Sequence, residues 1–332
     1  MYPVPYADID QAVELAVAAE RLGFDSVWGN DHVSTQAYVR AEFDDPPNFF
    51  DPWLYLSYVA AVTSTLRLAT CITVLPFRHP AVLAKQAATL DRLSHGRLTM
   101  GVGIGAYREE FTALWPGSAL NRGEHAGETL QALNLLFGER RASYDGKWVN
   151  FCDVESFPKP VQRPLPVLSG GNSTGSKLRA ATLATGWLPA CLTPDEVRAG
   201  VALIRAHAEG AGRELPEDFE VAVQLGVSVG STRQDAVARF ERSQLHSHMV
   251  SLSRSTLKDQ TTGGLADRNL VGTPEQILEQ IEQYRDAGVT TFAGLLFAVN
   301  TVSETEIAMD TFSRGVIARV ADPAPARRST AC

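Results

Sequence analysis

Short β-branched runs alternate with longer stretches of helical spacing along nearly the whole chain. This alternation is typical of βα units built around a parallel sheet. The alternation opens with a predicted helix over residues 8–22 rather than with a strand. We therefore predict an α/β fold, a TIM-type (β/α)8 barrel whose first strand is missing or truncated. The predicted strands are residues 24–28, 66–75, 97–101, 167–169, 186–190, 219–229 and 290–299.

One stretch interrupts the alternation. Residues 143–166 contain the hairpin signal YDGK at 144–147 and a group of prolines, which together predict a surface insertion. The predicted organisation is one barrel domain over residues 1–320 that carries this insertion. The last residues, 321–332, are rich in Pro, Ala and Arg and are predicted to be a disordered tail.

Composition and charge exclude several classes of partner. The 332 residues include 30 Lys+Arg and 38 Asp+Glu, a formal charge of −8 that repels phosphate backbones and anionic lipid. Nucleic acid and membrane surfaces are therefore not expected as partners. No run of about 18 apolar residues occurs, and the start MYPVPYADID lacks the features of a signal peptide. We expect a soluble cytoplasmic protein.

The cysteines predict neither a disulfide framework nor a metal site. Cys71, Cys152, Cys191 and Cys332 lie far apart, without a CxxC pair or the spacing of zinc ligands. This usage fits a reducing compartment. Cys71 lies in the middle of a predicted strand, where an unpaired thiol is usually part of the core rather than a nucleophile.

Functional groups in parallel βα architectures collect at the carboxyl ends of the strands. The loop directly after predicted strand 24–28 carries Asp31 and His32. A histidine can exchange a proton near neutral pH, and a neighbouring aspartate can orient it. The alternative is a helix-capping aspartate beside a structural histidine. A second loop carries Arg78 and His79, and there a solvated arginine and a helix entry are the favoured interpretation.

A third loop is rich in glycine. The stretch from Gly101 to Ala106 formally satisfies the dinucleotide pattern GxGxxA, with Glu124 downstream. A dinucleotide site requires a further strand about 20 residues later, and residues 107–137 predict two helices instead. A Rossmann site is therefore disfavoured. Gly103 and Gly105 are interpreted as letting the backbone approach a flat ligand ring.

A fourth loop, residues 169–176, lies between a predicted strand and a helix that starts near Thr174. Its amides and hydroxyl groups, together with the positive end of the helix, predict an anion site for which phosphate is the natural ligand. Lys177 or Arg179 can add charge. The alternative is a flexible loop that contains only a Ser/Thr helix cap.

Four stretches in order, residues 21–33, 66–111, 157–173 and 270–289, resemble the luciferase-like monooxygenase superfamily, in particular its F420 (deazaflavin)-dependent oxidoreductase branch. The resemblance covers nearly the whole chain and implies a TIM barrel of the bacterial-luciferase type. It also implies a small-molecule substrate and a homodimer, the common state of the family.

The same resemblance implies roles for individual residues. His32 matches the histidine near the reactive ring carbon, with Asp31 beside it. Residues 71 and 72 match a strand position that often holds a non-proline cis peptide behind the ring. The loop 170–173 matches one that touches the ring or its ribityl phosphate. The cofactor-binding residues expected are Cys71, Ile72, Thr73, Gly103, Gly105, Ala106, Gly170, Gly171, Asn172 and Ser173.

Two departures from the family pattern guide the functional prediction. Ala106 stands where some sugar-phosphate-oxidising deazaflavin enzymes have a catalytic glutamate, which disfavours that substrate class. Ile104 stands where bacterial luciferases place a phosphate-binding arginine, which disfavours FMN. The resemblance therefore implies an F420-dependent reductase or dehydrogenase, with proton delivery by His32 or a nearby group such as Glu109. The alternatives are a reduced-FMN-dependent monooxygenase and a catalytically silent flavin-binding relative.

Overall fold

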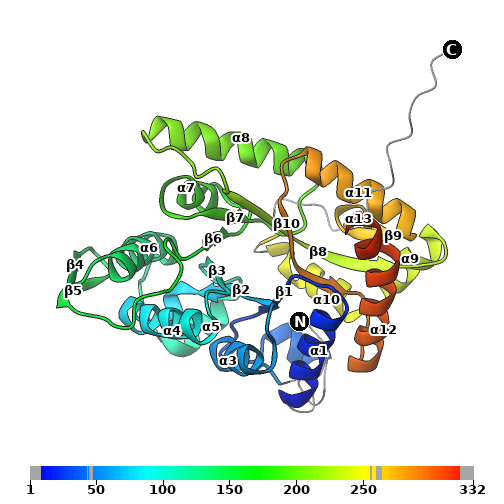
Figure 1. Cartoon of the computed structure of the whole chain (residues 1–332), viewed down its shortest axis with the longest axis horizontal. Helices are drawn as coiled ribbons and strands as arrows, with labels where there is room; N and C mark the ends of the chain where they lie inside the picture. Colours follow the sequence, from blue (N-terminus) through cyan, green and yellow to red (C-terminus); the bar gives the residue numbers. More distant parts are fainter. Residues whose placement is uncertain (1–8, 43, 45–47, 255, 259–263, 322–332) are drawn as a thin grey trace.

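The computed structural model describes residues 9–42, 44, 48–254, 256–258 and 264–321. Its centre is a parallel sheet in the strand order β1-β2-β3-β6-β7-β8-β10, with β9 paired to β8 (Figure 1). All seven predicted strands are present, so the predicted parallel α/β architecture is confirmed. The strands are β1 Ser26–Gly29, β2 Arg67–Val74, β3 Leu98–Gly103, β6 Val167–Gly170, β7 Gly186–Leu188, β8 Glu220–Val229, β9 Leu270–Gly272 and β10 Thr291–Phe297.

The helices begin where capping residues and proline predict them. Thr193 and Thr273 each form a capping box directly before a proline, so α8 and α11 start at these positions. The α-helices are α1 Ile9–Arg21, α2 Ala37–Glu42, α3 Pro52–Val62, α4 Pro80–Leu93, α5 Arg108–Leu114, α6 Arg122–Gly138, α7 Thr174–Leu183, α8 Pro194–Gly210, α9 Arg233–Glu241, α10 Gln244–Ser251, α11 Pro274–Asp286, α12 Val302–Phe312 and α13 Ala318–Ala321. Single 3-10 turns are η1 Leu75–Phe77, η2 Leu252–Arg254 and η3 Leu265–Arg268, and a π-helical turn, η4 Ser313–Ile317, joins α12 to α13.

Side chains alternate between the two faces of the sheet, as the period of a strand requires. The inner face of the curved sheet has a small core of its own. The outer face packs against the helices in the main core, which includes Leu68, Met100 and Val223. The inner core consists of Trp28, Ala69, Leu168, Leu188, Ala222 and Ala293, with Cys71 and Ile72 packed against it.

The barrel is open between the two ends of the strand order. Among the described residues, β1 pairs only with β2 and β10 pairs only with β8. Helices α1 and α12 lie beside this opening (Figure 1). A cavity of about 830 Å³ occupies it.

Three segments differ from the sequence prediction. The sequence did not predict β9, whose three residues are too short for a periodic signal. The single helix expected over 232–247 is two helices, because Ser243 caps a new helix, α10. The expected tail at 321–332 lies outside the described residues except for Ala321, at which α13 ends.

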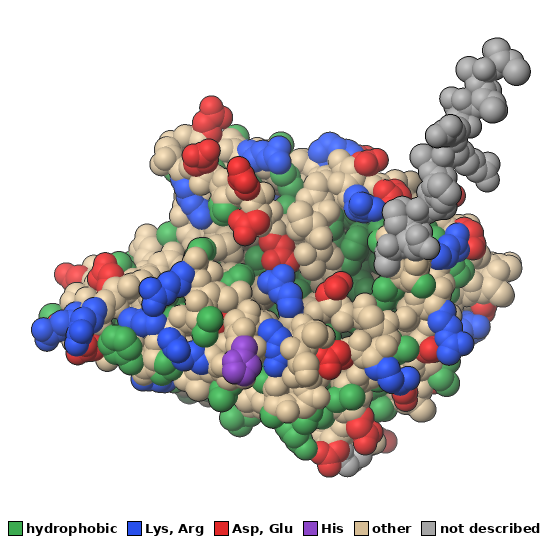
Figure 2. All heavy atoms as spheres, viewed as in Figure 1, with side chains coloured by type: hydrophobic (Ala, Val, Ile, Leu, Met, Phe, Trp, Pro, Cys, Tyr) green, Lys and Arg blue, Asp and Glu red, His purple; other side chains and the backbone are tan. Residues whose placement is uncertain are grey.

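The predicted surface insertion contains the antiparallel hairpin β4 Ala142–Asp145 and β5 Asn150–Val154. The two strands lie at the left edge of the molecule in Figure 1. Figure 2 shows Lys/Arg and Asp/Glu side chains interspersed over the face in view, without a large area of one sign. No helix in the described ranges has the length and apolar character needed to cross a membrane.

Candidate active site

The loops that carry the predicted site residues share one edge of the sheet. They follow β1, β2, β3 and β6, which are consecutive neighbours in the parallel strand order. The carboxyl ends of these four strands therefore meet at the same mouth. This arrangement brings together the segments around Asp31, Thr73, Tyr107 and Ser173.

Asp31 binds an arginine rather than the neighbouring histidine. Its carboxylate, 3% exposed, accepts hydrogen bonds from the backbone N–H of Val74 at 2.9 Å and from both terminal nitrogens of Arg78. Arg78 also donates to Asp51 at 3.2 Å. Burial disfavours the charged guanidinium, but the hydrogen bonds and charges of the two carboxylates outweigh it and raise the pKa of Arg78. The interpretation that Asp31 orients His32, and that Arg78 is merely solvated, is wrong.

His32 is held by a residue that the sequence analysis did not select. Its Nδ1 lies 3.1 Å and 3.2 Å from the two carboxylate oxygens of Glu110, which is 2% exposed. The expected proton-transfer residue Glu109 is exposed and accepts a hydrogen bond from the backbone N–H of Ala37 at 2.6 Å. The side chain that contacts His32 is therefore that of Glu110, and Glu109 caps the short helix α2.

Glu110 also organises the segment after His32. Its carboxylate accepts from the backbone N–H of Val33 at 3.1 Å and from the side-chain amide of Gln36 at 3.3 Å. Gln36 Nε2 lies 2.8 Å from His32 Nδ1 and donates to the carbonyl of Ser34 at 2.9 Å. An ionised carboxylate can only accept and an amide N–H₂ can only donate, so these two neighbours of Nδ1 require opposite tautomers. We assign the ring proton to Nδ1, because a hydrogen bond to a charged carboxylate is the stronger of the two, and Gln36 then donates to Ser34 and Glu110. The other ring nitrogen, Nε2, is then the one that can take up a proton.

Aromatic side chains and a second histidine surround His32. The rings of Phe49 and Tyr107 lie 5.3 Å and 6.1 Å from the His32 ring. Nδ1 of His248, on α10, lies 3.0 Å from the hydroxyl of Tyr38 and 3.4 Å from that of Tyr107. Burial and, secondarily, the charge of His32 lower the pKa of His248 to about 3. His248 was not predicted from the sequence, because its segment has no readable motif.

The segment 71–73 lies at the carboxyl half of β2. The peptide bond between Cys71 and Ile72 is cis, as the family resemblance implied. Burial raises the pKa of the Cys71 thiol to about 12, which fits a core residue rather than a nucleophile. Thr73 is fully buried, and its hydroxyl has no hydrogen-bond partner among the described residues. An orphaned buried hydroxyl costs free energy, so it is a candidate contact for a bound group.

The glycines of the site make room for a side chain of the chain itself. A Cβ on Gly103 would lie 2.3 Å from Cδ1 of Ile72, and one on Gly170 would lie 2.8 Å from its Cγ2. Gly105 has φ +78, and a Cβ there would lie 2.9 Å from Val74. The packing of Ile72 thus leaves no room for a Cβ at Gly103 or Gly170. The close approach of a flat ligand ring stays a prediction. The adjoining Ala106 is partly buried.

The loop after β6 combines structural bonds with an anion-binding geometry. Asn172 exchanges two hydrogen bonds with the backbone of Ala190, and Ser173 caps α7 through the N–H of Ser176. Gly171, with φ +109, directs this turn. Arg179 lies close to the first turn of α7, since its terminal nitrogen is 3.5 Å from a Cβ placed on Gly175.

The guanidinium of Arg179 is a candidate contact for a bound anion. Burial lowers the pKa of its guanidinium, and the described residues supply it with no hydrogen bond or ion pair. The amino end of α7 adds partial positive charge beside it. A phosphate group fits this place, because it would satisfy both the guanidinium and the helix amides. Lys177, the other cation considered, lies over the ring of Trp187 instead.

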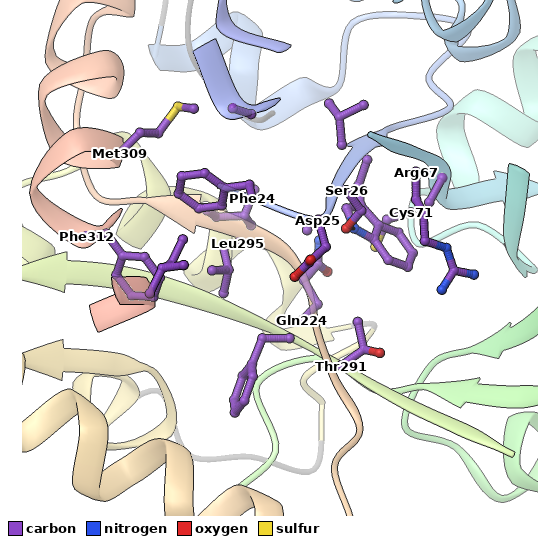
Figure 3. Close-up of a pocket in the computed structure, with 18 of the residues that line it drawn as sticks. Phe24, Asp25, Ser26, Arg67, Cys71, Gln224, Thr291, Leu295, Met309 and Phe312 are labelled. Carbon is purple, nitrogen blue, oxygen red and sulfur yellow. Dashed lines mark hydrogen bonds between the residues drawn. The ribbon is translucent and has the colours of Figure 1, made fainter. Parts of the chain in front are cut away.

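The cavity of about 830 Å³ does not coincide with the histidine cluster. It fills the opening between β1 and β10 (Figure 3), and Asn30, Cys71 and Phe297 line it toward the carboxyl ends of the strands. His32, Glu110 and the loop after β6 do not line it. We locate the candidate active site by the polar cluster at the strand ends, because the groups that can exchange a proton or hold an anion lie there.

The amino-acid sequence matches the family model for luciferase-like monooxygenases over residues 2–291. The chain belongs to this family. An uncharacterized protein of Mycobacterium tuberculosis is 40% identical over 174 residues, which are 50% of this chain and 59% of that protein. An F420-dependent hydroxymycolic acid dehydrogenase of the same organism is 25% identical over 289 residues, 85% of this chain and 78% of the relative.

A solved structure shares the fold of this luciferase-like chain. The crystal structure of a monooxygenase from Streptomyces bottropensis superposes with a TM-score of 0.77 and 23% identity, covering 94% of this chain and 93% of that one. The family resemblance inferred from the motifs and the TIM-barrel type of fold are confirmed. Of the three proteins named, one is an F420-dependent dehydrogenase and one a monooxygenase, so the family leaves the cofactor of this chain open.

Proposed function

We propose that this chain is an F420-dependent reductase or dehydrogenase that transfers a hydride between deazaflavin and a small organic substrate. The observation that carries the proposal is the buried Glu110 carboxylate beside Nδ1 of His32 at the mouth of the sheet. Such a pair fixes one ring nitrogen and leaves the other for proton exchange. When bound, the deazaflavin would supply the hydride chemistry itself.

The chain offers two contacts that suit such a cofactor. The loop after β6, the start of α7 and Arg179 would hold a phosphate group. The buried hydroxyl of Thr73 would donate to a polar atom of the ring system. Both contacts belong to segments at the carboxyl ends of neighbouring strands, which is where a barrel of this type binds ligands.

His32 would serve as the proton-transfer group. An oxidised substrate that receives a hydride also needs a proton, and the reverse reaction must remove one. Nε2 of His32 can do both while Glu110 keeps Nδ1 protonated and the ring oriented. The rings of Phe49 and Tyr107 would exclude water from this nitrogen.

The test is a comparison of cofactors and of one variant. We expect F420 to bind more tightly than FMN when cofactor fluorescence is followed with purified protein. His32→Ala should lower turnover about a hundredfold or more while cofactor affinity changes little. His207→Ala, on α8, is the matched control and should leave turnover unchanged. Equal turnover of the His32→Ala variant would remove His32 from the mechanism.

A reduced-FMN-dependent monooxygenase is the second candidate, supported by the monooxygenase likeness of the family. Oxygen dependence separates the two candidates, because F420-dependent hydride transfer proceeds without oxygen. Preference for reduced FMN, with turnover only in air, would favour the monooxygenase. Binding of a cofactor without turnover would support the catalytically silent flavin-binding relative, and binding of neither cofactor would contradict all three candidates.

A further inference from the structure

Helix α3 is apolar on all sides. Its sequence, PWLYLSYVAAV, contains no charged residue, and every residue except Ser57 is apolar or aromatic. One side of the helix packs into the main core through Trp53, Leu56 and Val59. A helix that is apolar all round is normally buried all round. The side of α3 that faces away from the core is therefore a candidate contact for a partner.

This outer side of α3 carries Leu54, Tyr58 and Val62. All three side chains are exposed, that of Leu54 to 75%. Residues four apart lie on the same side of a helix, so the three side chains form one apolar line. The line is about 12 Å long from the first residue to the last, and it leaves hydrocarbon in water over two turns of the helix.

Helix α4 and the segment after β5 widen the line into a face. α4 packs beside α3 in the lower part of Figure 1, and its Val82 and Leu93 are exposed. Lys85 of α4 donates to the backbone carbonyl of Phe157, and the backbone N–H of Val161 also bonds to α4. The side chains of Phe157 and Val161 are exposed. We call the seven exposed side chains, those of residues 54, 58, 62, 82, 93, 157 and 161, the α3/α4 face. Wide apolar areas of this kind mark interaction sites on soluble proteins.

The charges of the two helices favour a second copy of the chain as the partner. The carboxylates of α3 and α4 are limited to that of Asp91, which is buried. The exposed charged side chains of these helices are Lys85 and Arg92, which lie on α4 and not on the α3 line. The whole chain has a formal charge of −8. Two copies that repel each other elsewhere can therefore meet along α3 without opposing carboxylates.

We propose that the α3/α4 face binds the same face of a second copy, with α3 packed antiparallel to its counterpart across a two-fold axis near Tyr58. A two-fold interface needs one surface that fits itself. The line on α3 meets this need, because Leu54 and Val62 are equally far from Tyr58 in the sequence. Leu54 of each copy would pack on Val62 of the other, and the two Tyr58 rings would meet at the axis.

The α3/α4 face is separate from the candidate active site. It lies on the outer side of the helices, whereas His32 and Glu110 lie beyond the carboxyl ends of the strands. None of its seven side chains is assigned to cofactor binding or to proton transfer. The mouth of the sheet would stay accessible in the pair of copies. The proposal therefore does not rest on the proposed function.

The first test is the mass of the whole chain in solution, measured by sedimentation velocity over a series of dilutions. One chain has a mass of 36.0 kDa. We expect a species of twice this mass at micromolar concentration, which dissociates on dilution. A species with the mass of one chain at every concentration up to about 100 μM would overturn the proposal and leave the face to a different protein.

The second test uses charge substitutions on the α3 line. Leu54→Glu should raise the dissociation constant at least about tenfold, because it places a carboxylate against Val62 of the other copy. Val62→Lys alone should have a similar effect. In the double variant Leu54→Glu/Val62→Lys, opposite charges of the two copies meet, so association should recover in part. Residues eight apart do not pair within one helix, so recovery requires the second copy.

Two control variants make the result specific. Ile307→Glu changes a side chain on α12 that is 67% exposed and lies outside the face, and it should leave the dissociation constant unchanged. Leu54→Glu/Val62→Glu brings like charges together and should show no recovery. An equal effect of Ile307→Glu would overturn the proposal. Association that Leu54→Glu does not weaken, or a Leu54→Glu/Val62→Lys variant that does not recover, would overturn it as well.

The mass of the unaltered chain decides the proposal even if a substituted chain fails to fold, which circular dichroism would detect. All measurements are made without a cofactor. Failure of the proposed function and failure of this proposal are therefore distinguishable.

Discussion

Nδ1 of His32 lies within 3.2 Å of both carboxylate oxygens of Glu110, a residue 78 positions later in the chain. The contact joins the loop after β1 to helix α5, which follows β3. Strand β2 lies between β1 and β3 in the sheet, so the contact spans the loop that follows β2. The contact is almost completely shielded from solvent, since the side chains of His32 and Glu110 are 13% and 3% exposed. A charge so shielded interacts with its partner more strongly than one at the surface.

Glu110→Gln is therefore expected to impair proton transfer by His32 while the side chains around the imidazole stay in place. The amide keeps the shape of the side chain and some of its hydrogen bonds, but loses the negative charge that faces the imidazole. We expect turnover to fall about tenfold to a hundredfold while cofactor affinity changes little. A purely structural role would lower the free energy of unfolding and cofactor affinity together with turnover. Turnover, cofactor affinity and urea unfolding are the measurements, with Glu109→Gln as the matched control.

Asp31→Ala is expected to destabilise the fold rather than act on the chemistry. It leaves the Arg78 guanidinium, whose side chain is 13% exposed, with Asp51 as its remaining carboxylate. Removing one partner of a buried ion pair costs about 3–5 kcal/mol in the free energy of unfolding. Urea unfolding measures this change. Glu306→Ala, which breaks the exposed pair with Arg21, is the control, and an equally small effect of Asp31→Ala would contradict the assignment.

Sequence reasoning located the mouth of the site but not all of its partners. The position of the loops after successive strands follows from the alternation of strand and helix, so the sequence predicts that His32, Thr73 and the loop at 170–173 lie near one mouth of the sheet, and they do. Their roles in binding and catalysis stay predictions. The choice between Glu109 and Glu110 depends on the rotational phase of α5, a helix of seven residues with too few turns for a periodic signal. His248 approaches from a segment far along the chain, and no local pattern can report such a contact.

The glycines illustrate another limit of reasoning from sequence. The pattern around Gly103 was interpreted as a close approach to a ligand, because glycine permits it. The neighbour that occupies the space is Ile72, which comes from the adjacent strand. A sequence shows that a Cβ is missing, but not which atom fills the place.

Gly103→Ala should therefore be destabilising in a way that depends on Ile72. The new methyl group would lie 2.3 Å from Cδ1 of Ile72, and overpacking of this kind costs about 1–3 kcal/mol. Ile72→Val removes that carbon, so the double variant should recover part of the loss relative to the sum of the single variants. The measurement is the free energy of unfolding for all four proteins of the cycle.

Gly127→Ala is the control for this cycle. It lies within α6, and a Cβ there would have no neighbour within 4 Å. Alanine in a helix interior is about 0.5–1 kcal/mol more favourable than glycine, so this variant should be stabilised. Strict additivity of Gly103→Ala and Ile72→Val would show that the two side chains do not compete for space.

Burial of His248 is expected to make the folded chain less stable in acid. Its pKa is lowered from the usual 6.5 to about 3 in the folded chain, first by burial and then by the charge of His32. The unfolded chain therefore binds a proton that the folded chain does not, between pH 6.5 and about 3. The contribution to stability is complete above pH 6.5 and is lost as the pH falls through this window, at up to about 1.4 kcal/mol per pH unit.

His248→Asn tests this, because the amide oxygen can still accept from the hydroxyl of Tyr38 but does not titrate. The variant should lose less stability than the unaltered chain between pH 7 and pH 5, as measured by urea unfolding at both values. His207→Asn, on α8, should reproduce the slope of the unaltered chain. Identical slopes for the unaltered chain and His248→Asn would mean that His248 is protonated in the folded state, and that its contacts with Tyr38 and Tyr107 do not require a neutral ring.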